Sequence, residues 1–197
     1  MSIWWWQKST GFGQSHAYFN QFIDVHHSSK PRWLDVYPST ENIYSLDPNQ
    51  VFFVDIGGGI GHYTVGLKQC LPHITNCIIV QEMAAVLPTI IPCEGVEGME
   101  HVPSTPSAKF YSLSNIIHDY PDDKCVLILK NIVSAMGPDS IHLINDMVLP
   151  KFGAHWHVPQ VDLTMMSMLA SLKRTVEQWI YSSDKAVFGS VLEGVPI

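Results

Sequence analysis

Short apolar runs alternate with longer amphipathic stretches along this chain, which predicts strands and helices in turn. The run at residues 51–56 is rich in β-branched and aromatic side chains, as expected for a strand buried on both faces. A helix is predicted over residues 63–71, because Pro72 would end it. The same patterns predict strands over residues 74–81, 109–117, 140–149 and 187–197, and helices over residues 121–136, 162–172 and 175–185, the last with Thr175 as its N-cap.

This order of elements is typical of an α/β fold with a largely parallel sheet. Residues 92–106 are rich in glycine, proline and glutamate and are predicted to form a loop. Residues 1–50 show no strong periodicity, and their many aromatic side chains are expected to pack against the main domain or a second chain. The chain therefore divides into an aromatic amino-terminal segment, residues 1–50, and an α/β domain, residues 51–197.

Asp55 and a dense group of glycines, which includes Gly57, Gly59 and Gly61, lie at the end of the first predicted strand. Glycine lets the backbone adopt a positive φ and lets a ligand approach the main chain without a Cβ in the way. The spacing G-x-G-x-G differs from the dinucleotide pattern G-x-G-x-x-G, and no G-K-[ST] of a P-loop follows. An acid before the glycines favours a cationic or hydroxyl-bearing ligand, which indicates S-adenosylmethionine more than NAD or ATP.

Glu82 lies at the carboxyl end of the second predicted strand, about 20 residues beyond the glycines. An acid in this place can accept hydrogen bonds from both ribose hydroxyls of a bound nucleoside. The alternative is an acid at the start of a helix over residues 84–90, where a carboxylate stabilises the helix dipole. The glycines beside it favour the ribose role.

Composition and charge narrow the classes of partner. A length of 197 residues fits one domain with a sizeable core, and a formal net charge of −7 argues against a nucleic-acid partner. The four cysteines form no C-x-x-C pair and the ten histidines show no metal-ligand spacing, so we predict neither disulfides nor a metal site. No signal peptide or membrane-spanning stretch is evident, so a cytoplasmic protein with reduced thiols and no membrane partner is expected.

Taken together, the segments VDIGGGIGH, HDYPDDKC, INDMVLP and DLTMMSMLASLKRTVEQW resemble the S-adenosylmethionine-dependent O-methyltransferases of fungi and plants. The resemblance covers almost the whole chain, and its most specific piece is HDYPDDKC. It implies a three-layer α/β/α sandwich of the class I methyltransferase type, which is Rossmann-like, and S-adenosylmethionine as the cofactor.

The resemblance also implies a role for each matching position. His118 would be the general base that removes the proton from a substrate hydroxyl, which suits an imidazole because it can bind and release a proton near neutral pH. Asp119 would help to place the substrate, and Asp146 would orient the base. The cofactor would be held by Asp55, Gly57, Gly59, Gly61 and Glu82, and the substrate would be contacted by Asp162 and Met165.

Several positions depart from that family's pattern. Lys173 stands where a second acid is expected, Ser114 stands where a basic residue is expected, and residues 99–102 lack the acidic and aromatic motif that contacts the adenine. A cation near the base would disfavour the imidazolium form. From the resemblance, we expect the residues of this chain to include only the last piece of the family's amino-terminal dimerisation domain. The chain also has room for one terminal strand in place of an antiparallel pair, so a missing strand and an exposed sheet edge are expected.

The resemblance implies methyl transfer from S-adenosylmethionine to a hydroxyl of a small aromatic or polyketide-like secondary metabolite. One alternative is a repurposed methyltransferase fold that catalyses a cyclisation, a dehydration or a pericyclic step, which the altered motifs would suit. Another is a catalytically weak partner subunit. A small-molecule substrate and a homodimer or other oligomer are expected.

Overall fold

A computed structural model describes residues 46–100, 105–146, 148–153, 156, 159–160, 162–163, 166 and 173–185. These residues all belong to one compact unit, Pro38–Ile197. The predictions for residues 1–45, for the strand over residues 187–197 and for Met165 lie outside the described residues.

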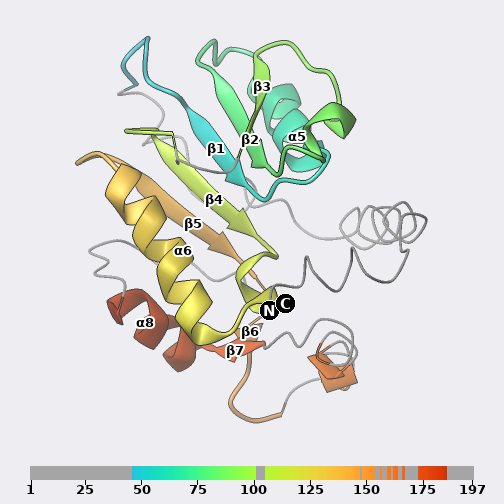
Figure 1. The fold of residues 1–197 in the computed structure, drawn as a ribbon, viewed down its shortest axis with the longest axis vertical. Coiled ribbons are helices and arrows are strands. Elements are labelled where there is room, and N and C mark those ends of the chain that lie inside the picture. The colour runs from blue at the N-terminus through green and yellow to red at the C-terminus, as the bar shows by residue number, and fades with distance from the viewer. Residues whose placement is uncertain are drawn as a thin grey trace. The chain divides into compact units, whose positions relative to one another are not determined.

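The centre of the fold is a parallel sheet whose strands lie in the order β3-β2-β1-β4-β5 (Figure 1). The strands are β1 (Phe53–Ile56), β2 (Ile78–Glu82), β3 (Val96–Glu100), β4 (Phe110–Ser114) and β5 (Ile141–Asn145). The first strand lies in the middle, where Phe53 is opposite Ile78 on one side and Phe110 on the other. Because the chain order reverses at this strand, a ligand crevice is expected at its carboxyl end.

The strand β3 corrects the prediction of a loop over residues 92–106. Its five residues pair in parallel with β2, from Val96 opposite Ile78 to Glu100 opposite Glu82. Most of them are exposed, because β3 is an edge strand of the described sheet, so the sequence needs no apolar run there. Its glycine has a packing reason, since a Cβ on Gly98 would lie 2.8 Å from Cδ1 of Ile90.

Helices cover both faces of the sheet, which confirms the predicted three-layer α/β/α fold. On one face, Thr64 in α5 (His62–Cys70) contacts Asp55 in β1. On the other face, α6 (Asp122–Ala135) and α8 (Val176–Lys185) pack against alternate residues of the strands (Figure 1). The main buried cluster on that face is made of Val54, Ile56, Ile79, Tyr111, Leu113, Ile144, Cys125, Leu129, Ile132 and Trp179.

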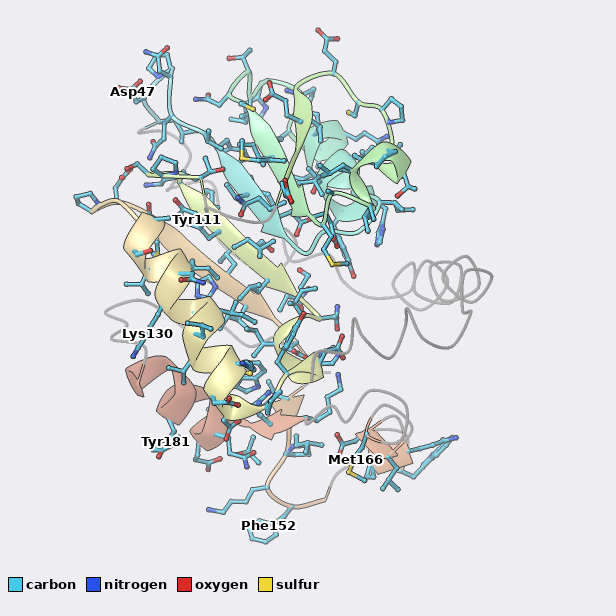
Figure 2. The ribbon with its side chains drawn as sticks, viewed as in Figure 1. Asp47, Tyr111, Lys130, Phe152, Met166 and Tyr181 are labelled. Atoms are coloured by element: carbon cyan, nitrogen blue, oxygen red, sulfur yellow. The ribbon has the colours of Figure 1, made fainter. Side chains whose placement is uncertain are left out.

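Tyr111, which is labelled in Figure 2, joins the sheet to the end of α6. Its hydroxyl accepts a hydrogen bond from Ala108 N at 3.0 Å and lies 2.5 Å from Thr105 O and 3.1 Å from Ala135 O. The polar end of a buried tyrosine therefore finds partners, as a buried hydroxyl must.

The shorter elements follow local signals. Two three-residue 3-10 helices, η2 (Leu87–Thr89) and η3 (Ile117–Asp119), follow β2 and β4, and β6 (Val148–Leu149) pairs in parallel with β7 (Arg174–Thr175). Thr175 caps α8 as predicted, because its Oγ1 accepts from Gln178 N at 3.4 Å and its own N donates to Gln178 Oε1 at 2.9 Å. None of the described helices combines the length and the apolar character that a bilayer crossing needs.

Candidate functional site

The predicted functional residues follow four neighbouring strands of the sheet. The glycine turn follows β1, Glu82 ends β2, the turn that carries His118 follows β4, and Asp146 follows β5. Because these strands run parallel, their carboxyl ends meet at one edge (Figure 1). Residues far apart in the sequence therefore lie close together.

The glycines of the turn serve different purposes. Gly57, Gly59 and Gly61 all have positive φ, at 70°, 58° and 81°. A Cβ on Gly57 would lie 2.6 Å from Cδ1 of Ile116, whereas a Cβ on Gly59 would meet no atom of the described residues within 4 Å. Gly57 therefore allows close packing against the His118 turn, and Gly59 leaves open space beside the main chain, which is what a ligand requires.

Asp55 lies beneath the turn rather than at its open side. Only 2% of it is exposed, and its Oδ2 accepts a hydrogen bond from Thr64 Oγ1 at 2.7 Å. A Cβ on Gly58 would lie 2.7 Å from the same Oδ2. Burial raises the pKa of Asp55 to about 6; the Thr64 hydrogen bond opposes this rise and the charge of Glu82 adds to it. Asp55 thus ties β1 to the first turn of α5.

Replacing Asp55 with asparagine should change how stability depends on pH. The pKa of Asp55 rises from 3.8 to about 6 on folding, so between those pH values the folded protein keeps a proton that the unfolded chain has lost. Stability therefore falls as pH rises through this window. We therefore expect the unfolding free energy of D55N minus that of wild type to rise by about 3 kcal/mol between pH 3 and pH 7.

Urea unfolding across this pH range measures the difference. D123N is the matched control, because it makes the same carboxyl-to-amide change at an exposed position, the start of α6. A constant difference between D55N and wild type would contradict the buried, proton-binding Asp55.

Glu82 joins the end of β2 to the glycine turn. Its Oε1 accepts from Gly59 N at 3.2 Å and its Oε2 from Met83 N at 2.7 Å, so the carboxylate is fixed beside the open face of Gly59. Each carboxylate oxygen keeps a further lone pair that can accept from a hydroxyl. The alternative role at the start of a helix over residues 84–90 is not favoured, because the helix described there, η2, begins only at Leu87.

His118 is held by Asp146 across the ends of β4 and β5. Its Nδ1 lies 2.7 Å from Oδ1 and 2.9 Å from Oδ2 of Asp146, and both side chains are buried. An ionised carboxylate only accepts hydrogen bonds, so Nδ1 carries a proton, and in the neutral form of the imidazole the lone pair is on Nε2. This is the geometry that a general base and an acid orienting it would need.

Asp119 lies at the other nitrogen of the same imidazole. Its Oδ1 is 3.3 Å from His118 Nε2. Burial raises the pKa of Asp119; the charges of His118 and Lys173 oppose this rise and that of Asp146 adds to it. His118 thus stands between two carboxyl groups, one at each ring nitrogen.

Lys173 meets the orienting acid, not the imidazole. Its Nζ lies 3.4 Å from Asp146 Oδ1, and its side chain is buried. Its backbone N donates to Asp162 Oδ1 at 3.0 Å, so this predicted substrate residue lies against the start of β7. The side chain of Met166, which is labelled in Figure 2, is half exposed. Met166 follows Met165, which lies outside the described residues.

Sequence reasoning missed Arg174. Its fully buried guanidinium contacts the turn that carries His118 and also Asp122 at the start of α6. Two consecutive cations, Lys173 and Arg174, in a chain with eleven lysines and arginines were the available signal. Charged side chains are rarely buried unless they are paired, so only the structure could show that Lys173 and Arg174 are both buried and paired.

Comparisons with known proteins agree with this architecture. The family described as "O-methyltransferase domain" matches residues 42–188. The chain is 41% identical over 152 residues to demethylsterigmatocystin 6-O-methyltransferase of Aspergillus parasiticus. The aligned region covers 75% of this chain and 39% of that protein. The chain therefore spans about two fifths of the length of that relative.

Two solved structures are also similar. One is LepI in complex with SAH and a substrate analogue, which is 37% identical with a TM-score of 0.73 and covers 80% of this chain and 43% of that chain. The other is described as a pericyclic reaction enzyme and is 33% identical with a TM-score of 0.80, over 94% of this chain and 49% of that chain.

Proposed function

Because this chain belongs to the O-methyltransferase domain family, we propose that it transfers a methyl group from S-adenosylmethionine to a hydroxyl of a small aromatic or polyketide-like molecule. The observation that carries this proposal is the buried His118–Asp146 pair, with 2.7 Å between Nδ1 and Oδ1, at the same sheet edge as the glycine turn. A general base and a nucleoside-type pocket at one edge are what this reaction needs.

The residues at the ends of β1 and β2 fit the cofactor. The space beside Gly59 is open, and the Glu82 carboxylate next to it has lone pairs for two ribose hydroxyls. We assign the main contacts with the cofactor to Gly57, Gly59, Gly61 and Glu82, with Asp55 supporting the turn from beneath. When bound, S-adenosylmethionine supplies an electrophilic methyl group and leaves as a neutral thioether.

Replacing Gly59 with alanine should strongly weaken cofactor binding while the protein still folds. In the part of the chain that the structure describes, the new Cβ meets no atom within 4 Å, but it fills the space assigned to the ligand, and φ 58° costs an L-residue about 1–2 kcal/mol. We expect the clash between this Cβ and the cofactor to raise the Kd for S-adenosylmethionine at least about 100-fold, which corresponds to about 3 kcal/mol.

G66A is the matched control, because a Cβ on Gly66 also meets none of the described residues within 4 Å and Gly66 lies inside α5. Alanine there should stabilise the helix by about 0.5–1 kcal/mol and leave binding unchanged. Calorimetric titration measures both variants, and equal affinities for G59A and wild type would count against the assigned pocket.

In the proposed reaction, this chain's residues move one proton and hold the reactants. His118 Nε2 takes the proton from the substrate hydroxyl as the oxygen forms its bond to the methyl carbon. Asp146 keeps the ring oriented through Nδ1, and the imidazolium that forms lies between the carboxyl groups of Asp146 and Asp119, 2.7 and 3.3 Å away. Asp162 and Met165 are proposed to contact the acceptor.

A second candidate function is a pericyclic, cyclising or dehydrating reaction on the same fold. It is favoured by the buried Lys173 ammonium, 3.4 Å from Asp146, which lowers the net negative charge available to stabilise an imidazolium. The similarity to a structure described as a pericyclic reaction enzyme points the same way.

Mass spectrometry of the product separates the two functions. The full chain is incubated with S-adenosylmethionine and a panel of phenolic polyketides. Methyl transfer predicts a product that gains the mass of one CH2 unit, because a methyl group replaces the hydroxyl hydrogen, and only when the cofactor is present. A product that forms without such a gain would support the second function and overturn the first.

We further propose that the protein acts in the cytoplasm as a homodimer or other oligomer. All four cysteines are free, which suits a reducing compartment. Large apolar side chains lie exposed on α6 and α8, namely Leu127, Val176 and Tyr181, the last labelled in Figure 2. Sedimentation that shows a stable monomer would contradict the oligomer.

A further inference from the structure

The turn that carries His118 has little regular structure of its own. The 3-10 helix η3 has three residues, and its backbone hydrogen bonds run from Asp119 N to Ile116 O at 3.1 Å and from Tyr120 N to Ile117 O at 3.2 Å. Such short 3-10 runs have poor hydrogen-bond geometry and gain their stability from tertiary contacts. The position of the imidazole therefore depends on what holds this turn.

Arg174 holds the turn on both sides of His118. Its Nη1 donates to Ile117 O at 3.2 Å and its Nη2 to Tyr120 O at 2.9 Å. Its Nε and Nη2 also donate to Asp122 Oδ1, at 3.1 and 2.7 Å, where α6 begins. One planar guanidinium thus fixes the carbonyl before His118, the carbonyl two residues after it and the start of the next helix.

No other described side chain duplicates this contact at equal strength. Cys125 Sγ lies 3.4 Å from Ile117 O and 3.3 Å from Tyr120 O, but a thiol is a weak donor. Arg174 is only 1% exposed and lies 5.5 Å from the centre of the Trp179 ring. Removing it would leave the carbonyl of buried Ile117 and the partly buried carbonyl of Tyr120 without their strong donor.

The side chain just before β7 also reaches the acid proposed to orient the base. Lys173, the residue before Arg174, lies with its Nζ 3.4 Å from Asp146 Oδ1. The consecutive side chains of Lys173 and Arg174 therefore contact Asp146 and the turn that carries His118. A displacement of β7 would separate His118 from Asp146.

We propose that Arg174 is a positioning residue that fixes the His118 imidazole at hydrogen-bond distance from Asp146. Its catalytic consequence rests on the proposed function, but its structural consequence does not. The proton on His118 Nδ1, which donates to a carboxylate 2.7 Å away, is a direct reporter, because a short charge-assisted hydrogen bond moves its NMR resonance downfield.

The test compares this resonance in the full chain of wild type, R174M, R174K and K109M, with the assignment made from its absence in H118N. K109M is the matched control: Lys109 is 4% exposed, donates to Asp139 O at 3.1 Å and lies just before β4, at the opposite end from His118. We expect the resonance to be lost in R174M, weakened in R174K and kept in K109M, even where thermal unfolding temperatures fall alike.

A folded R174M or R174K that keeps the wild-type resonance would overturn the proposal. If R174M does not fold, R174K decides, because it keeps the charge and loses the planar fork. Where methyl transfer is measurable, kcat should fall about 100-fold in R174M with little change in KM for S-adenosylmethionine. If wild type transfers no methyl group while R174M still loses the resonance, the proposed function fails and this inference stands.

Discussion

Replacing His118 with asparagine should reduce kcat for methyl transfer about 1,000-fold, because a positioned general base contributes on this order. Asparagine keeps a polar side chain near Asp146 but cannot accept the hydroxyl proton. The Kd for S-adenosylmethionine should stay within about two-fold of wild type, since the base touches the acceptor and not the nucleoside. Steady-state kinetics and calorimetry measure the two quantities separately.

H73N is the control for that experiment, because His73 is exposed and lies between α5 and the start of β2, away from the carboxyl ends of the strands. It should match wild type in both kcat and Kd. If H118N kept more than a tenth of the wild-type kcat, the proton would leave by another route and the assignment of the base would be wrong.

Replacing Asp146 with asparagine should cost both activity and stability. The carboxylate fixes Nδ1 as the protonated nitrogen of His118, and an amide no longer does so, which should lower kcat by about 100-fold to 10,000-fold. The same change removes the carboxylate 3.4 Å from the buried ammonium of Lys173. Breaking one side of a buried ion pair costs about 3–5 kcal/mol of unfolding free energy.

The double variant D146N/K173M separates these two effects. Removing the ammonium as well leaves no uncompensated buried charge, so much of the lost stability should return. Activity should not return, because the imidazole still lacks its orienting acid. Urea unfolding and kinetics report the two outcomes. A double variant that is no more stable than D146N would show that Lys173 does not depend on Asp146.

Local signals in the sequence predicted the elements that depend on local chemistry. The run at residues 51–56 is apolar because β1 is buried on both faces, and Thr175 caps α8 because its hydroxyl meets a backbone N–H three residues later. The strand β3 was missed because an edge strand can be formed from polar residues, and its order comes from pairing with β2.

The candidate site also depends on contacts between elements that lie far apart in the sequence. His118 and Asp146 are 28 residues apart, and no spacing rule joins them; their contact arises because β4 and β5 are parallel neighbours. The resemblance to known methyltransferases supplied this pair, and the structure brings the two side chains together. The resemblance could not predict the contacts of Lys173 with Asp146 and of Arg174 with the turn that carries His118, because both contacts depend on how β7 packs in three dimensions.

Calorimetric titration of S-adenosylmethionine into wild type, H118N and E82A tests most directly whether the edge formed by β1 and β2 holds the cofactor opposite the base. We expect wild type and H118N to bind one molecule with similar Kd. We expect E82A, which lacks the carboxylate 3.2 Å from Gly59 N, to bind at least about 100-fold more weakly, a loss of about 3 kcal/mol. Binding by E82A as tight as by wild type, or no binding by wild type, would contradict the account.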